Sequence, residues 1–436
     1  MDPLLATLLI LAAAILAFLS GRIPLEVVAI GVALALWATG VLTLPEVLAG
    51  FGDPTVLFIA SLFVVAGALD ATGVTRWAGG FIVARAGSRR GPVTIWIIGV
   101  AALLTSLISI NGAVAALVPV VAVVARRSGI PVSQLMIPLA FAGSAGSLLT
   151  LTGTPVNVVA SELAEEAVGR PIGFVEFALV GGPLLIVSAL VMLVWAPRAL
   201  PAHGPGPHVP LTEREEENLA LVPETVRTGA TRVPRTAGGL GRGARRTLII
   251  AGVMVVLLAT GLVPPAVAGL LAAAAILLTR VLPADVAYHS ISWTTIILIA
   301  GMIPLSNAVL DSGAADALAD LVLGLVGTAS PHLALLVVCL VTVVLGQFIS
   351  NVATVLVVAP VAVSIAATLE VSALPFIVGL AVAGAAAFLT PVATPANLMV
   401  LEPGGYRFGD YWRLGLPLAA VFVAFAVLYV PLVWPF

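Results

Sequence analysis

The chain carries one set of polar and helix-breaking residues twice, 240 residues apart. Asn111 corresponds to Asn351, and Thr154-Pro155-Val156-Asn157 corresponds to Thr394-Pro395-Ala396-Asn397. Other matched pairs are Gly21 and Gly261, Pro24 and Pro264, Thr55 and Thr295, and Gly73 and Gly313. Each copy lies inside long apolar stretches. Two copies of one membrane unit, each with polar breaks at bilayer depth, are typical of a secondary transporter.

Composition predicts an all-α polytopic membrane protein. The chain is 61% hydrophobic and 9% charged, with a mean hydropathy of +1.20. Runs of roughly 20 apolar residues span a hydrocarbon layer of about 30 Å. No basic patch indicates a nucleic-acid partner, and the single Cys339 provides no disulfide framework. No His-Glu-x-x-His motif, Ser/Lys pair or carboxylate pair lies within an apolar run, so an intramembrane enzyme is not predicted.

The apolar runs define two units of the same order, 1–196 and 247–436. In the first unit we predict spans at 4–20, 25–44, 55–72 and 174–196, an interfacial segment at 74–90, a hairpin at 92–127 and a broken span at 133–160. In the second we predict spans at 247–263, 265–282, 293–311 and 414–434, an interfacial segment at 313–328, a hairpin at 331–368 and a broken span at 372–400.

Segment 92–127 is too long for one span and has Ser109-Ile110-Asn111-Gly112 at its middle. Two short helices that meet at a polar tip form a re-entrant hairpin, which is tolerated only where protein or a cavity surrounds the tip. Because a hairpin returns to its own side, each unit crosses the membrane five times. An odd number of crossings inserts the second unit upside down, so two inverted five-span repeats are predicted.

The arginines support this topology. All 19 basic residues are Arg, and every one except Arg170 falls on one predicted face, while many carboxylates, Glu162 and Asp53 among them, fall on the other. The positive-inside rule makes the arginine face cytoplasmic. We therefore expect an inner-membrane protein with both termini outside. The Pro-, Gly-, Arg- and Glu-rich stretch 197–246 is expected to be a flexible cytoplasmic linker.

The chemistry is predicted at four polar breaks, 109–112, 150–157, 350–354 and 390–397. Proline removes backbone donors and opens a helix. The freed carbonyls suit a hard cation such as Na⁺, and half-helix N-termini suit an anion. No charged side chain lies well inside a span, which favours coupling to a metal cation over a proton. Protonation of the substrate itself leaves proton coupling open. Tyr411 and Trp412 are expected in the interfacial aromatic belt.

These paired motifs resemble the divalent-anion/sodium symporter family of the ion-transporter superfamily, whose members carry dicarboxylates, citrate and sulfate. The stretch from Pro403 to Pro417 is similar to the bacterial permease branch of that family, and Gly173 to Phe177 with Pro183 is a weaker copy. The family has Ser-Asn-Thr at each hairpin tip. Here the tips read Ile110-Asn111-Gly112 and Ser350-Asn351-Val352. Both threonines are absent, which leaves an anion other than a C4-dicarboxylate open.

The resemblance implies an anion site between the two tips and one Na⁺ site at each break. The anion site would contain Asn111, Gly112, Thr154, Pro155, Asn351, Val352, Thr394 and Pro395. The first Na⁺ site would contain Ser109, Asn111, Thr152, Gly153 and Asn157. The second would contain Ser350, Asn351, Thr354, Thr390, Ala393 and Asn397.

The resemblance also implies a homodimer in which hairpins and broken spans move as one body, an elevator-type mechanism. The predicted function is Na⁺-coupled uptake of a small divalent or multivalent anion. A proton-coupled or efflux carrier on the same fold, and a passive anion channel, are the alternatives.

Overall fold

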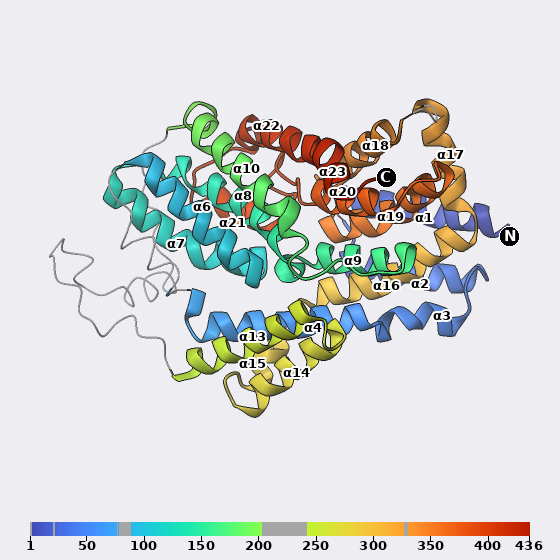
Figure 1. The fold of residues 1–436 in the computed structure, drawn as a ribbon, viewed down its shortest axis with the longest axis horizontal. Helices are drawn as coiled ribbons and strands as arrows, with labels where there is room; N and C mark the ends of the chain where they lie inside the picture. The colour runs from blue at the N-terminus through green and yellow to red at the C-terminus, as the bar shows by residue number, and fades with distance from the viewer. Residues whose placement is uncertain (1, 21, 76, 78–88, 203–241, 327–329) are drawn as a thin grey trace.

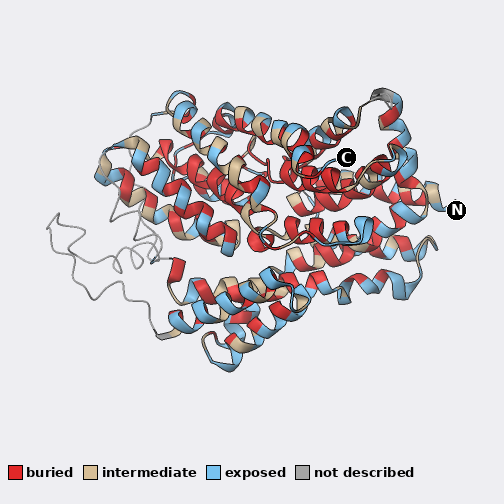
Figure 2. Cartoon of the chain, viewed as in Figure 1, coloured by how far each residue is buried: buried red, intermediate tan, exposed pale blue. Residues whose placement is uncertain are grey.

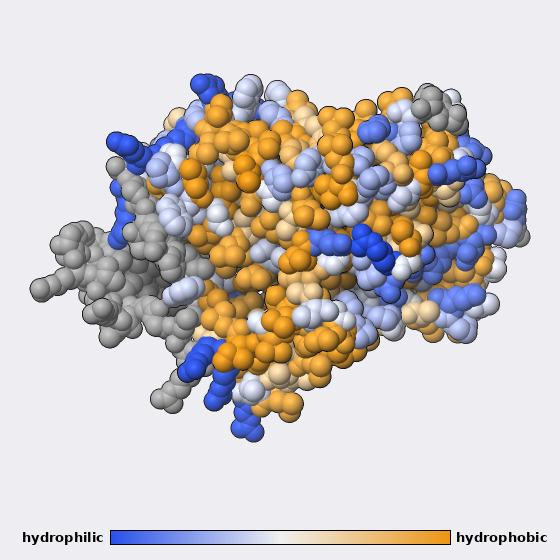
Figure 3. Space-filling view, viewed as in Figure 1, coloured by the Kyte–Doolittle hydropathy of each residue, from blue (hydrophilic) through white to orange (hydrophobic). Residues whose placement is uncertain are grey.

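The computed structural model describes residues 2–20, 22–75, 77, 89–202, 242–326 and 330–436. Every regular element in these ranges is helical, and 10 of the described helices are long and apolar enough to cross a membrane. The visible surface is mostly apolar, and hydrophilic side chains lie mainly toward the two ends of the long axis (Figure 3). The prediction of an all-α polytopic membrane protein is confirmed.

The helices follow one order in both halves of the chain. The first half contains α1 (Pro3–Ser20), α2 (Leu25–Ala38), α3 (Leu44–Ala49), α4 (Pro54–Ala71), α6 (Arg90–Leu107), α7 (Ile110–Ser128), α8 (Met136–Gly146), α9 (Pro155–Val168) and α10 (Ala178–Ala199). The second contains α13 (Arg242–Thr260), α14 (Pro265–Leu278), α15 (Ala284–Ser290), α16 (Trp293–Asp311), α17 (Ala314–Val326), α18 (Pro331–Leu345), α19 (Asn351–Thr368), α20 (Leu374–Gly384), α21 (Pro395–Leu401), α22 (Tyr411–Ala424) and α23 (Val430–Val433).

Helices from the two halves pack against each other in matching pairs. Helix α4 packs on α14, and α16 packs on α2. Likewise α9 packs on α19 and α20, while α21 packs on α7 and α8. In Figure 1, α4, α13, α14 and α15 lie together along one side, and α6, α7, α8 and α10 lie together above them. Neither half therefore forms a separate domain core.

The centre of the molecule is built from the first halves of the two broken spans. Every residue of α8 and α20 is buried, and buried residues are concentrated around these helices (Figure 2). The ring of Phe141 of α8 lies tilted against that of Phe388, with centroids 4.7 Å apart, and Phe388 meets Phe422 edge to face at 4.8 Å. These rings join the two halves of the chain directly beside both breaks.

Some predicted spans end earlier than expected. The spans predicted at 25–44 and 265–282 are helical only to Ala38 and Leu278. Each helix is followed by a residue with positive φ, Gly40 at 75° and Arg280 at 52°. A left-handed residue just past the end closes a helix even where apolar residues continue. Prediction from hydropathy alone therefore placed the ends of both helices too late in the chain.

Other segments differ at their edges. The broken span predicted at 133–160 continues in α9 to Val168, and the final span contains a π-helical turn at Phe425–Tyr429. The expected interfacial segment at 313–328 includes α17, where Asp316 Oδ1 accepts a 2.5 Å hydrogen bond from Ser364 Oγ of α19. Most of the predicted interfacial segment 74–90, and most of the predicted linker 197–246, lie outside the described residues.

Two adjacent glycines of α10 test the packing against the first break. A Cβ on Gly181 would lie 2.1 Å from the Leu148 carbonyl oxygen, whereas a Cβ on Gly182 would meet nothing within 4 Å. We expect Gly181→Ala to lose about 1–3 kcal/mol, as overpacking does, and Gly182→Ala to change stability by less than about 0.5 kcal/mol. Thermal unfolding of the detergent-purified variants measures both. Equal midpoints would contradict this close approach.

Candidate functional site

The first break separates α8 from α9. Two short 3₁₀ turns, Ser147–Leu149 and Leu151–Gly153, replace the helix, and α9 restarts at Pro155. The Asn157 side-chain nitrogen donates to the carbonyl oxygens of Ser147 and Thr150, both at 2.8 Å. One asparagine therefore satisfies two backbone carbonyls that the missing helical turn has freed.

The second break repeats this arrangement. Asn397 Nδ2 donates to the carbonyl oxygens of Ala387 at 2.8 Å and Thr390 at 3.1 Å. Thr394 caps α21 by accepting from the Asn397 backbone N–H at 3.2 Å, as Thr154 caps α9 by accepting from the Val156 N–H at 3.4 Å. The Thr-Pro-x-Asn motif is thus a cap, a helix start and a backbone clamp in four residues.

Serine caps the second helix of each hairpin. Ser109 Oγ accepts from the Gly112 N–H, and Ser350 Oγ accepts from the Ala353 N–H, each at 3.2 Å. Each capping serine therefore satisfies one of the free N–H groups at the start of the second helix of its hairpin.

Threonines tie each hairpin to its break. The hydroxyls of Thr150 and Thr152 both donate to the Ser106 carbonyl oxygen at the end of α6, the latter at 3.2 Å. In the second half, Thr390 Oγ1 donates to the Gln347 carbonyl oxygen at 3.2 Å. The end of each hairpin's first helix is therefore joined to the break that follows it in the chain.

Four buried side-chain oxygens at these breaks have no hydrogen-bond partner. They are Asn157 Oδ1, Asn351 Oδ1, Thr354 Oγ1 and Asn397 Oδ1. A buried polar atom without a partner costs about 1–3 kcal/mol, so four of them at the breaks need an explanation. Neutral oxygens of this kind, together with freed carbonyls, fit a hard monovalent cation. In the described ranges, no group of three His, Cys, Asp or Glu residues offers an alternative metal site.

The two sites are not equally enclosed. Asn351 is half-buried, whereas Asn111 is exposed. Helix α19 packs against α9, α16, α17, α18 and α20, while α7 packs against α6, α8 and α21. Three of the four unpartnered oxygens belong to the second site.

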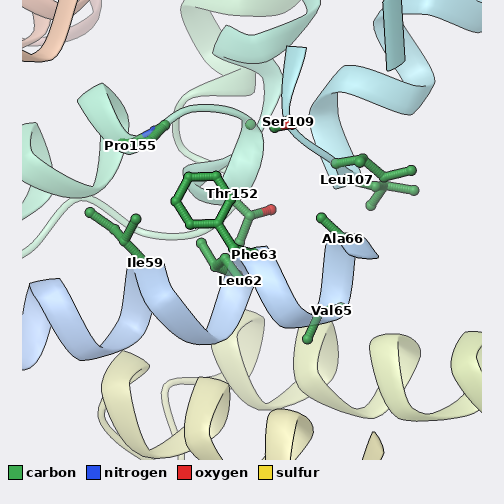
Figure 4. A pocket seen from close by; sticks show the side chains of 11 residues that line it. Ile59, Leu62, Phe63, Val65, Ala66, Leu107, Ser109, Thr152 and Pro155 are labelled. Carbon is green, nitrogen blue, oxygen red and sulfur yellow. The ribbon is translucent and has the colours of Figure 1, made fainter. Parts of the chain in front are cut away.

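A small, mainly apolar cavity lies beside the first break. Helix α4 contributes Ile59, Leu62, Phe63 and Ala66, which point toward Ser109, Thr152 and Pro155 (Figure 4). The cavity is thus between α4 and the first site, and not between the two hairpin tips.

The remaining predicted residues line the breaks in different ways. A Cβ on Gly153 would lie 2.1 Å from the Ser147 carbonyl oxygen, so only glycine fits there. Val352 and Ala393 are buried, and Gly112 is half-buried. Val352 and Gly112 occupy the positions of the missing threonines and offer only backbone groups.

Gln347 is a site residue that the sequence reasoning missed. Its side-chain nitrogen donates to the Val343 and Ala386 carbonyl oxygens at 2.8 and 3.2 Å, and its side-chain oxygen accepts from the Leu389 N–H at 2.9 Å. It binds the unwound chain before Thr390. A lone amide at the end of an apolar run, three residues before Ser350, was the available signal.

The prediction that Tyr411 lies in the interfacial belt is wrong. Tyr411 is fully buried, and its hydroxyl donates to the Asn397 carbonyl oxygen at 2.6 Å. Tyr406 is also buried, and its hydroxyl donates to the Ser133 carbonyl oxygen and accepts from the Ile137 N–H at 3.0 Å. The neighbouring Trp412 is exposed. Both tyrosines satisfy distant backbone groups, which no local pattern reveals.

One acidic side chain of α9 lies against the start of α4. Glu162 is half-buried on α9 and interacts with the Thr55 side chain and with Asp53 at the start of α4. The sequence placed it only at the outer face.

Comparison with known proteins identifies the family. The citrate transporter family model CitMHS matches residues 15–336 and 306–436. The chain belongs to this family. It is therefore a membrane transporter of the citrate, dicarboxylate and sulfate group, and not an enzyme. The resemblance drawn from the motifs is confirmed.

Relatives of similar sequence are also described as transporters. An uncharacterized transporter of Escherichia coli K12, YfbS, is 27% identical over 99% of this chain and 99% of its own length. That alignment runs over 607 positions, so the relative contains inserted sequence that this chain lacks. The sodium-dependent dicarboxylate transporter SdcS of Staphylococcus saprophyticus is 23% identical over 84% of this chain and 73% of its own length.

Two solved structures share the fold. The YdaH transporter of Alcanivorax borkumensis has a TM-score of 0.58 at 17% identity, covering 90% of this chain and 88% of that one. MtrF of Neisseria gonorrhoeae, described as an antimetabolite efflux pump, has a TM-score of 0.57 at 13% identity, covering 100% and 95%.

The clamp role of Asn157 is testable. Asn157→Ala removes both donors and leaves the Ser147 and Thr150 carbonyl oxygens unpaired, so we expect a loss of about 1–3 kcal/mol of stability. Asn307→Ala is the matched control, because Asn307 lies exposed on α16. Thermal unfolding should separate the two variants. Equal midpoints would show that Asn157 does not hold the break together.

Proposed function

We propose that the chain is an inner-membrane, Na⁺-coupled importer of a small divalent or multivalent anion. The observation that carries this proposal is the pair of clamped breaks, which leave buried neutral oxygens of Asn157, Asn351, Thr354 and Asn397 without partners. Na⁺ would bind these oxygens together with the capping serines, Asn111 and the carbonyls of the 152–157 and 390–397 segments. Its charge replaces the positive side chain that the site lacks.

The anion is assigned to the space between the two hairpin tips. The N-termini of α7, α9 and α19 begin at Ile110, Pro155 and Asn351, and a helix N-terminus carries about half a positive charge. Asn111, Thr154, Asn351 and Thr394 would supply hydrogen bonds to the anion. Gly112 and Val352 supply no side-chain hydroxyl at the tips, which leaves an anion other than a C4-dicarboxylate open.

Transport of the anion would be coupled to Na⁺ because each ligand binds more tightly when the other is bound. An anion binds well only after Na⁺ has brought positive charge to the site, and Na⁺ gains affinity from the anion by the same free energy. The printed names of relatives, a sodium-dependent dicarboxylate transporter and a probable sodium/sulfate cotransporter of Chlamydomonas reinhardtii, support this proposal.

The same proposal includes an elevator motion in a homodimer, with both termini outside and the 197–246 stretch in the cytoplasm. The interlocked packing of α9 on α19 and α20, and of α21 on α7 and α8, supports movement of both breaks as one body.

A proton-coupled carrier is the second candidate. Glu162 favours it, because this titratable side chain lies on α9 seven residues after Pro155. Flux that follows a pH gradient and ignores Na⁺ would select the proton. Flux without any ion coupling, or without saturation, would select a passive channel.

A panel of anions tests the proposal directly. Sulfate, succinate, malate, citrate, aspartate and phosphate are added to the detergent-purified protein, each with Na⁺ or with choline. A ligand that binds only the folded state raises its stability, by about 2.7 kcal/mol at a concentration of 100 Kd. We expect one anion class to raise the melting temperature only with Na⁺. An equal rise in choline would contradict Na⁺ coupling.

The substitution Thr354→Val tests whether the Thr354 hydroxyl binds Na⁺ or whether the side chain only packs in the interior. Because Thr354 Oγ1 has no partner, its removal should maintain or raise stability without Na⁺. We expect the Kd for Na⁺ to weaken about tenfold, which removes about 1.4 kcal/mol of Na⁺-dependent stabilisation. Melting temperature against Na⁺ concentration measures both effects.

Thr342→Val is the matched control for this experiment. Thr342 is equally buried, but its hydroxyl donates to the Val338 carbonyl oxygen at 2.7 Å within α18. The control should keep the wild-type Na⁺ response. A Thr354→Val variant that loses stability and binds Na⁺ normally would exclude Thr354 from the site.

A further inference from the structure

We propose that Tyr411 is a positioning residue for the cation site at the second break, holding Asn397 in place through its backbone carbonyl. The inference rests on the proposed function for the identity of the cation. Its structural basis is the 2.6 Å hydrogen bond from the Tyr411 hydroxyl to the Asn397 carbonyl oxygen. Tyr411 itself touches no proposed ligand atom and acts through Asn397.

Asn397 is held from two sides. Its side-chain nitrogen is fixed by the carbonyl oxygens of Ala387 and Thr390, and its main chain is fixed by Tyr411. The remaining group, Asn397 Oδ1, is buried without a partner. With both other groups fixed, the direction of this oxygen is determined by the scaffold and not by the ligand, which is what pre-organises a binding site.

Tyr411 is itself rigidly placed. It begins α22 directly after a turn in which Asp410 Oδ2 accepts from the Arg407 N–H at 2.8 Å. Its ring lies 5.8 Å from the Tyr406 ring and 6.4 Å from the Phe141 ring. Gly415, one turn later, lets α22 approach the Phe388 carbonyl, because a Cβ there would lie 2.2 Å from that oxygen. The hydroxyl therefore has little freedom to move away from Asn397.

The first half of the chain has the same frame without the hydroxyl. Glu176 Oε2 accepts from the Gly173 N–H at 2.7 Å, as Asp410 does from Arg407, and the next residue is Phe177. Gly181 packs on the Leu148 carbonyl as Gly415 packs on that of Phe388. Phe177 thus occupies the position of Tyr411, and a phenylalanine has no donor for the Asn157 carbonyl. The two breaks are held differently, and the second, with three of the four unpartnered oxygens, has the additional restraint.

Tyr411→Phe removes only this hydroxyl and installs the side chain that the first half already has. We expect the Na⁺ concentration for half-maximal uptake to rise about five- to tenfold, as the loss of one buried hydrogen bond predicts, while uptake at saturating Na⁺ stays near the wild-type rate. Tyr406→Phe is the matched control. It removes a second buried hydroxyl from the same aromatic cluster, but that hydroxyl binds Ser133 and not the break.

Hydrogen exchange measures the restraint without any ion. In Tyr411→Phe, we expect faster amide exchange in peptides that cover 387–401 and unchanged exchange in 147–160. Tyr406→Phe should change neither the exchange at 387–401 nor the half-saturating Na⁺ concentration. Faster exchange with a normal Na⁺ response, an equal Na⁺ shift in both variants, or a folding failure of Tyr411→Phe alone would each overturn the proposal.

These measurements test Na⁺ coupling and the positioning role of Tyr411 separately. A wild type whose uptake ignores Na⁺ would refute the proposed coupling, yet exchange at 387–401 would still decide whether Tyr411 restrains the break. Unchanged exchange in Tyr411→Phe would overturn the positioning role even if uptake in the wild type follows Na⁺.

Discussion

The fold depends on how backbone groups are satisfied where two helices open inside an apolar interior. A freed carbonyl costs several kcal/mol in hydrocarbon, so an unwound segment persists only if protein groups replace the lost helical bonds. Asn157 and Asn397 each replace two, and Thr150 and Thr390 anchor the same segments to the neighbouring hairpins. The geometry of any ligand site here is set by these clamps.

The hydrogen bonds of the two clamp asparagines explain why one residue type can be both structural and functional. The amide nitrogen of each clamp asparagine is fully used by the backbone, while its oxygen remains unpartnered. A bound cation would compensate for the cost of burying that oxygen. The apo site is thus expected to be less stable than the loaded one, which links occupation of the site to the stability of the breaks.

Positions of the breaks could be predicted from sequence because their causes are local. Proline, a capping threonine and an asparagine three residues later determine where α9 and α21 begin, at Pro155 and Pro395. Ends marked only by a left-handed residue, such as Gly40, were missed because apolar residues continue beyond them. Tyr411 was misplaced because its hydroxyl reaches Asn397 only through the tertiary fold, which the order of the sequence does not report.

The contacts between the two broken spans differ in kind from those between the first break and α4, and the difference affects which parts can move together. Between the two broken spans the contacts are directional: Tyr406 of the second half binds Ser133 and Ile137 of the first, and the tilted rings of Phe141 and Phe388 are in contact. Between the first break and α4, the cavity is lined mainly by apolar side chains, including Leu62 and Phe63. Apolar surfaces lose little when they slide, because they hold no directional bond that must be broken and remade, whereas hydrogen-bonded contacts resist displacement. An elevator motion would therefore move the two breaks together along α4, and it would have to break the contacts of Glu162 with Thr55 and Asp53 at the start of that helix.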